Sequence, residues 1–190
     1  LRRAVPLLRS DYPVTDFTPR CATGQQSQTW GISLWMPYHG TGAPLSDPYT
    51  MRSCFVPAYR LGWDTANQGI DHALLRKTVE DFRQVEKCLL GDFYPLTPYS
   101  TDEDVWLGWQ SDVPERGEGI VQVFRRRTSF YESARLKLRG LEAKGTYAVT
   151  NLDDSAARQE LTGSELMDKG LRVDISTQPG SALFTYRKIK

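Results

Sequence analysis

Residues 106–125 read Trp-Leu-Gly-Trp-Gln-Ser-Asp-Val-Pro-Glu-Arg-Gly-Glu-Gly-Ile-Val-Gln-Val-Phe-Arg, and this stretch divides the chain into two parts. Apolar and polar residues alternate within it, which is typical of half-buried strands. Turn signals such as 151–154 and 178–181 recur downstream. Short strands at this spacing predict an antiparallel β-sandwich or barrel. We expect its strands at 106–110, 119–125, 133–138, 145–151, 170–175 and 182–188, with a short turn over 162–167 that Ser164 caps.

The part before residue 101 has a different pattern. Its apolar run over 29–38 predicts a buried parallel strand, and the aperiodic residues 10–28 before it predict a long loop. Residues 67–90 repeat apolar side chains at helical spacing up to Gly91, a candidate C-cap. We also expect a helix end or turn over 1–9, a helical turn after Asp47 and a second strand over 55–61.

Strand–loop–helix units followed by an all-β region predict an α/β plus all-β fold. We expect residues 1–100 to form the terminal βα units of a (β/α)8 barrel, and residues 101–190 to form a C-terminal antiparallel β-sandwich domain. Residues 91–104 carry two Pro and an acidic stretch, so they are the expected linker. A barrel is not stable on its last strands alone, and we therefore expect the chain to be the C-terminal part of a larger enzyme.

Composition excludes several classes of partner. A net charge of +1 over 190 residues argues against a nucleic-acid or anionic-membrane binder, and we read Arg125-Arg126-Arg127 as a solvated loop. No apolar run reaches the ~18 residues of a membrane span. Three Cys without a Cys-x-x-Cys spacing predict buried, reduced thiols rather than a zinc site. A soluble protein follows, while a cytoplasmic or secreted location is left open.

Chemistry in barrel enzymes lies at the carboxyl ends of the strands. Here the expected ends lie near Asp11 and Asp16, around 38–42, and at Trp63-Asp64. Carboxylates beside aromatic rings suit glycoside hydrolysis, because one carboxyl protonates the leaving oxygen while a second attacks or directs water. An Asp in a loop is more often a turn residue or a helix cap, and this reading stays the alternative.

Four residues are candidates for binding the sugar: Trp30, Trp35, Tyr38 and His39. Along the expected strand, alternation allows Trp35 and His39 to face the same way, but not all four. Core filling is the alternative for each Trp. For His39 the alternative is a structural hydrogen bond, because a lone His without partners specifies little.

Three segments resemble the α-galactosidase-like enzymes of glycoside hydrolase family 36. Residues 1–12, Leu-Arg-Arg-Ala-Val-Pro-Leu-Leu-Arg-Ser-Asp-Tyr, resemble the segment that follows that family's glycine-rich Cys-Ala-Ser-Gly-Gly motif. Residues 29–42 resemble the next strand in one branch of the family, and residues 106–126 resemble the entry into its C-terminal β domain. The likeness spans essentially the whole chain, with its motifs in the family's order.

The resemblance implies a retaining hydrolase of α-galactosides that uses two Asp residues and no metal or organic cofactor. The family's acid/base Asp lies in a Trp-Thr-Ser-Asp stretch, which matches Leu8-Arg9-Ser10-Asp11 and gives the role to Asp11. The flanks differ, since Arg9 replaces Thr and Tyr12 follows, so Asp16 stays a second candidate. The nucleophile's Trp-Asp-x-Asn motif is missing; Trp63-Asp64 matches only its start, and we read Asp64 as a strand-end or cap residue.

Two other interpretations compete with the hydrolase. The chain would then be a non-catalytic carbohydrate-binding module, or an assembly element whose apolar strand edges require the remainder of the barrel or a second copy of the chain. The expected partners are thus a galactoside or other glycoside, the rest of the catalytic barrel, and a homo-oligomer. Hydrolysis and transglycosylation are not distinguished, because they differ only in what attacks the glycosyl-enzyme.

Overall fold

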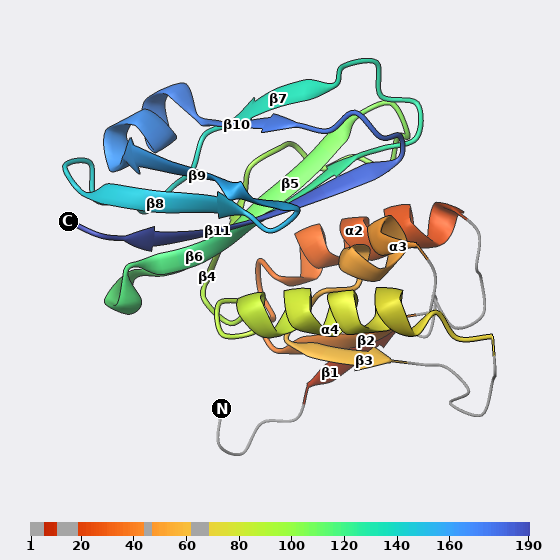
Figure 1. The fold of residues 1–190 in the computed structure, drawn as a ribbon. Coiled ribbons are helices and arrows are strands. Elements are labelled where there is room, and N and C mark those ends of the chain that lie inside the picture. Colours follow the sequence, from red (N-terminus) through yellow and green to blue (C-terminus); the bar gives the residue numbers. More distant parts are fainter. Residues whose placement is uncertain (1–5, 11–18, 44–46, 62–68) are drawn as a thin grey trace. The chain divides into compact units, whose positions relative to one another are not determined.

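The structure is a computed structural model that describes residues 6–10, 19–43, 47–61 and 69–190. The chain divides into two compact units, Leu1–Leu90 and Gly91–Lys190 (Figure 1). We call them the N-terminal unit and the β unit, and each is described by itself. This division falls before the sequence-based boundary at residues 100/101.

The N-terminal unit alternates strands and helices. Its three-stranded parallel sheet has the order β1-β2-β3, formed by β1 (Leu7–Ser10), β2 (His39–Ala43) and β3 (Ala58–Leu61). Helices α2 (Pro19–Ile32), α3 (Pro48–Ser53) and α4 (His72–Val85) follow these strands in turn (Figure 1). No helix among the described residues is long and apolar enough to cross a membrane.

Two sequence-based expectations in this unit are wrong. Helix α2 occupies much of the expected loop over 10–28 and the first part of the expected strand over 29–38; the strand itself starts only at His39. The loop reading failed because Gln25 and Gln26 are fully buried helix residues rather than solvated ones. A short apolar run such as 29–38 also cannot be told from a helix segment by periodicity. Near the N-terminus, 7–10 form a strand instead of a helical turn.

The other two helices are confirmed, and both begin at an Asp cap. The Asp47 carboxylate accepts a hydrogen bond from the Thr50 amide at 3.0 Å at the start of α3. At the start of α4, Asp71 accepts hydrogen bonds from the amides of Ala73 and Leu74. Each cap satisfies amides that the first helical turn leaves without partners. Helix α4 ends at Val85, so Gly91 is not its C-cap.

The β unit contains a six-stranded antiparallel sheet and a two-stranded one. The larger sheet has the order β4-β5-β6-β11-β8-β9, and β7 pairs with β10 in the smaller. All six strands expected from the sequence are present. The bounds are β4 (Asp92–Pro95), β5 (Trp106–Val113), β6 (Glu118–Arg125), β7 (Ser133–Leu136), β8 (Thr146–Asn151), β9 (Asp154–Thr162), β10 (Leu171–Asp174) and β11 (Gly180–Lys188).

One hydrophobic core joins the two sheets. Val121, Val123 and Phe184 from the larger sheet and Leu136 and Val173 from the smaller all belong to it. Burying each such side chain stabilises the fold by roughly 1.5–3 kcal/mol. The β unit is therefore a two-layered antiparallel domain, as the sequence predicts.

Strands β4 and β9 were not expected, and both lie at the edges of the six-stranded sheet. Strand β9 lacks apolar alternation because its residues are mostly exposed. Strand β4 lies within the predicted linker and pairs with β5. After β9, Thr162 and Glu165 form a reciprocal cap: the Thr162 amide donates to the Glu165 carboxylate, and the Glu165 amide donates to Thr162 Oγ1. Thr162 therefore does what we expected of Ser164, which makes no side-chain cap bond.

The basic run is not a solvated loop. Arg126 is fully buried, and its Nη1 donates to the carbonyls of Ser100 and Asp102, both at 2.8 Å. Arg125 is 4% exposed and is also bonded to backbone carbonyls. Only Arg127 is exposed. The two buried guanidiniums therefore hold loops of the β unit in place. We call the contacts of Arg126 with the carbonyls of Ser100 and Asp102 the Arg126 clamp.

Candidate functional site

The carboxyl ends of the parallel strands form the candidate site. Because β1, β2 and β3 run in the same direction, their last residues, Ser10, Ala43 and Leu61, lie toward one edge of the sheet. The register brings Ser10 beside Thr41 and Ala43 beside Leu61. Any residue that directly follows these strands starts from this edge, which we call the carboxyl edge.

Close contact between strands holds this edge in register. A Cβ on Gly40 would lie 2.7 Å from the carbonyl oxygen of Ala58 in the neighbouring strand, so β2 needs a residue without a side chain here. On the other side, the Leu7 amide donates to the Tyr38 carbonyl at 3.1 Å and fixes the start of β1. Short strands of four or five residues are thus aligned by backbone contacts.

Asp11 comes directly after the last residue of β1, so its place in the sequence is that of a barrel's catalytic carboxylate. Asp11 itself lies outside the described residues, as do Asp16, Trp63 and Asp64. The acid/base role of Asp11, with Asp16 as the second candidate, therefore stays a prediction.

Arg9 places a buried cation two residues before Asp11. Its Nη2 donates to Gln25 Oε1 of α2 at 2.8 Å. Among the residues that the structure describes, its buried Nε and Nη1 have no hydrogen-bond partner. Burial lowers the pKa of Arg9 to about 10, so the guanidinium is still charged at neutral pH. In the sequence, Arg9 was noticeable only because it replaces the Thr of the family's Trp-Thr-Ser-Asp stretch.

His39 lies at the opposite end of β2 from the carboxyl edge. It is the first residue of the strand, about 13 Å along the chain from Ala43 at 3.3 Å per residue. It is fully buried, and its Nε2 lies 2.9 Å from Ser33 Oγ. Burial, helped by the positive charge of Arg9, lowers the pKa of His39 to about 4. A neutral imidazole in this place fits the structural hydrogen-bonding alternative.

The other proposed sugar-binding residues do not lie on strand ends. Trp30 is half-buried in α2, Trp35 is 69% exposed in the turn that follows, and Tyr38 is half-buried just before β2. The strand alternation on which we based their common orientation is therefore wrong, because only His39 of the four lies in a strand. Their contact with a sugar stays a prediction, without that geometric support.

The remaining reactive groups of the unit are buried and neutral. Burial raises the pKa of the Cys54 thiol and of the Tyr59 phenol. Cys21, Cys54 and Cys88 are all buried and form no disulfide, as the sequence predicts. Among the described residues, no group of three or more His, Cys, Asp or Glu side chains has an arrangement that could hold a metal ion.

The family description "Glycosyl hydrolase family 36 C-terminal domain" matches residues 106–185, which is most of the β unit. None of the curated protein sequences matches the chain. Several solved structures do match the chain. The α-galactosidase from Lactobacillus brevis is 17% identical, with a TM-score of 0.71 over 89% of this chain and 25% of that one.

Two further structures give the same result. A variant of the family 36 α-galactosidase AgaA from Geobacillus stearothermophilus, solved with raffinose, is 16% identical, with a TM-score of 0.70 over 88% of this chain and 24% of its own. The galactosidase domain of the α-galactosidase-sucrose kinase AgaSK is 17% identical, with a TM-score of 0.68 over 88% and 25%. At such identities the likeness establishes the fold, and the chain spans about a quarter of each structure's length.

Proposed function

Because the chain carries the C-terminal domain of glycosyl hydrolase family 36, we propose that it is the C-terminal part of a retaining glycosidase that acts on α-galactosides. The observation that carries the proposal is the position of Asp11, directly after a parallel strand in a βα unit that precedes this domain. The structural likeness to α-galactosidases extends over 88% of the chain and thus includes most of the N-terminal unit.

In this proposal the N-terminal unit supplies the last βα units of the catalytic barrel. Three parallel strands, each followed by a helix, have the local organisation that such a barrel repeats. Strands β1 and β3 are the outer strands of the three-stranded sheet, so each has one edge free to pair with further strands. Its partner would be the remainder of the barrel.

Asp11 would be the general acid and base. As a carboxylic acid it protonates the glycosidic oxygen of the leaving group while a second carboxylate attacks the anomeric carbon. As a carboxylate it then takes a proton from the water that releases the sugar. In retaining enzymes the two carboxyl groups are about 5–5.5 Å apart. The second must come from another strand, because this chain has no Trp-Asp-x-Asn segment.

The roles of the neighbouring groups follow from their charge. His39 is neutral at pH 7 and lies at the other end of β2, so we give it no proton-transfer step. Arg9 is the charged side chain closest in sequence to Asp11 on β1. We assign it to the packing of β1 against α2, because within the described part of the chain its side chain donates to Gln25. Trp30, Trp35 and Tyr38 stay candidates for the sugar contact.

The test uses the complete open reading frame that contains residues 1–190. The purified product should release galactose from raffinose, and Asp11→Asn should lower kcat about 10²–10⁴-fold, the usual contribution of a general acid or base. On p-nitrophenyl α-galactoside, whose phenolate leaves without being protonated, azide should restore turnover of Asp11→Asn and yield α-galactosyl azide, since a small anion attacks the glycosyl-enzyme without base assistance. Asp16→Asn is the matched control and should keep most of the activity. Equal loss in both variants, or no loss in either, contradicts the assignment.

The 190-residue chain on its own should be inactive on α-galactosides. Retaining hydrolysis needs two carboxylates, and the sequence offers only one with a matching motif. Release of galactose from raffinose by the pure chain, abolished by Asp11→Asn, would show that both carboxylates are present in these residues.

A further inference from the structure

The outer face of the small β7–β10 sheet is polar and hollowed. Register places Arg172 opposite Arg135 and Asp174 opposite Ser133, so these four residues share the face turned away from Leu136 and Val173 of the core. Ser133, Ala134, Arg135 and Arg172 line a hollow of about 260 Å³. This volume is below the ~300–1,000 Å³ of pockets for drug-sized ligands, and it suits one small unit.

Two exposed aromatic rings come just before this face in the chain. Phe130 and Tyr131, in the loop that leads into β7, are 86% and 72% exposed and lie edge to face with centroids 5.5 Å apart. Tyr131 precedes the hollow's Ser133 by only two residues. Most large apolar side chains of the β unit are buried, so a pair of rings this exposed marks an interaction site better than a single one would.

The loop that carries the rings is fixed rather than loose. The Ser129 carbonyl accepts hydrogen bonds from Arg125 Nη2 at 3.2 Å and from Gln178 Nε2 at 2.7 Å. The Trp106 indole donates to the Tyr131 carbonyl at 3.0 Å, and the Ile175 amide donates to the Glu132 carbonyl at 2.8 Å. Four hydrogen bonds to the carbonyls of Ser129, Tyr131 and Glu132 thus fix the backbone of segment 129–132, while the two aromatic rings are exposed to solvent. Such preorganisation lowers the entropy cost of binding.

Charge on the face is partly balanced, and its mixture of donors and acceptors suits a hydroxyl-rich ligand. Both Nε and Nη2 of Arg172 donate to the Asp174 carboxylate at 3.0–3.2 Å, so this cation is already neutralised. Arg135 donates to the Gly170 carbonyl at 3.4 Å and keeps other donors free. The hollow therefore offers N–H donors and a hydroxyl, the Asp174 carboxylate lies on the same face, and the two rings come just before it in the chain. Sugar hydroxyls both donate and accept, and the C–H faces of a pyranose ring pack on aromatic rings.

We propose that Phe130, Tyr131, Arg135 and Arg172 form a sugar-binding site on the β unit, which takes one pyranose ring of an oligosaccharide. The site belongs to the β unit, whereas the carboxyl edge belongs to the N-terminal unit. It rests on the proposed function only for the choice of probe, an α-galactosyl oligosaccharide. Its role is to hold the sugar chain without reacting with it.

The test is an ¹⁵N–¹H NMR titration of the 190-residue chain with stachyose to about 50 mM, which detects the millimolar affinities expected of one small site. The Asp11→Asn variant is used throughout, so that hydrolysis does not enter the result. We expect the amide shifts to concentrate at 130–135 and 171–174. No shift at these residues, or shifts elsewhere only, overturns the proposal.

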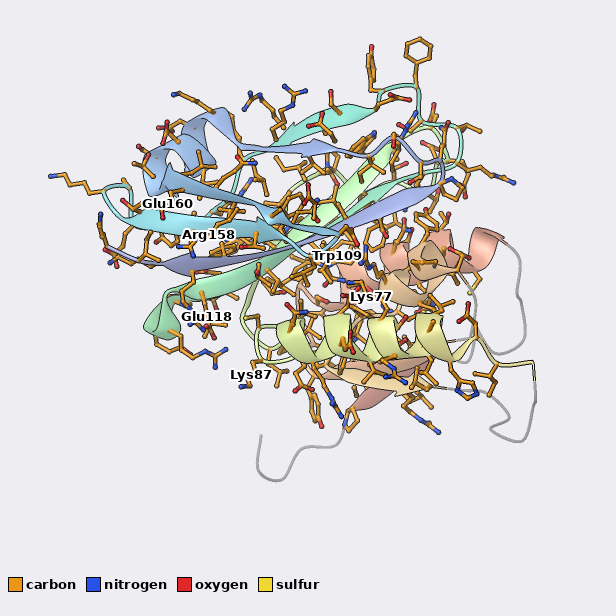
Figure 2. The ribbon with its side chains drawn as sticks, in the orientation of Figure 1. Lys77, Lys87, Trp109, Glu118, Arg158 and Glu160 are labelled. Carbon is orange, nitrogen blue, oxygen red and sulfur yellow. The ribbon has the colours of Figure 1, made fainter. Side chains whose placement is uncertain are left out.

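Variants distinguish binding at this site from non-specific binding. Phe130→Ala with Tyr131→Ala, and separately Arg172→Ala, should weaken binding about tenfold or more. Arg158→Ala is the matched control, because Arg158 and Glu160 form the same kind of exposed pair, two residues apart, on strand β9 (Figure 2). Unchanged affinity in the first two variants contradicts the proposal. Shifts of the same amides with protein concentration, and none with stachyose, would assign the face to a second copy of the chain instead.

Discussion

Arg9 and His39 show how burial sets the chemistry of single residues in the N-terminal unit. Arg9 stays charged although burial lowers its pKa to about 10, whereas burial and Arg9 together lower the pKa of His39 to about 4. Neither state can be read from the sequence, since it depends on the Gln25 and Ser33 partners that α2 and the turn after it bring close. The sequence did identify the three Cys as unpaired, because their number and spacing already excluded a framework of disulfides.

The protonation state of His39 can be measured directly. The chain has only two His residues, so a ¹³C–¹H NMR titration of their imidazole Cε1–H signals resolves both, and His39→Gln assigns them. We expect the His39 signal to stay constant from pH 7 to pH 5 and to titrate near pH 4. A midpoint near the ordinary value of 6.5 would show that the imidazole is solvated.

The same shift makes the N-terminal unit sensitive to acid. His39 binds a proton more weakly when folded than when unfolded, so folding stability is present above pH 6.5 and is lost as the pH falls toward 4. The full loss is on the order of 3 kcal/mol at 1.36 kcal/mol per pKa unit. His39→Gln should weaken the dependence of the free energy of unfolding on pH. Urea titrations at several pH values, with unfolding monitored through the amide hydrogen exchange of β2, measure this dependence. An equally steep loss in the variant would assign the effect to another group.

At the scale of elements, buried polar residues account for most of the differences between prediction and structure. Helix α2 was read as loop and strand because its Gln residues look solvated in the sequence, yet Gln26 Nε2 donates to Ser53 Oγ inside the unit at 3.0 Å. Strand β9 was missed for the opposite reason, since an exposed edge strand has no apolar alternation. The central strands β5, β6 and β11 were predictable because they alternate between core and opposite face. The Arg126 clamp could not be predicted, because its acceptors are carbonyls distant in sequence.

Removing the Arg126 clamp should destabilise the β unit. Arg126→Met leaves the carbonyls of Ser100 and Asp102 without their donor, and hydrogen bonds from charged donors contribute roughly 1.5–3 kcal/mol each. We expect a loss of about 3 kcal/mol in the free energy of unfolding by urea. Arg127→Met is the control, since it removes the same charge from an exposed neighbour and should change stability by less than about 0.5 kcal/mol. Equal effects of the two substitutions would mean that net charge, not the clamp, matters.

For the whole molecule, the chain is two units whose division lies at Leu90/Gly91. The expected linker contains β4, which pairs with β5, and the residues after β4 are also tied to the β unit: Thr97 Oγ1 accepts from the Gly108 amide, and the Ser100 carbonyl accepts from Arg126. Its proline content and acidic stretch suggested a linker, because an edge strand of four residues has little pattern of its own.

This division predicts where the β unit can be cut. A polypeptide of residues 91–190 should melt cooperatively, whereas residues 101–190 should melt several degrees lower or aggregate, because β5 loses its partner strand and Arg126 loses an acceptor. The two polypeptides differ only in residues 91–100, so the difference in Tm reports β4 together with the contacts of Thr97 and Ser100. Far-UV circular dichroism gives the melting curves. Identical Tm values would show that residues 91–100 do not stabilise the β unit, and would place its boundary at residues 100/101 instead.

The central claim is that Asp11 is the acid/base residue of a family 36 α-galactosidase of which this chain forms a part. The most direct measurement is the raffinose turnover of the complete gene product, with Asp11→Asn compared with Asp16→Asn. We predict that Asp11→Asn loses about 10²–10⁴-fold in kcat on raffinose, while Asp16→Asn stays near the activity of the unchanged protein. Full activity of Asp11→Asn, or no hydrolysis of raffinose by the unchanged product, would contradict the claim.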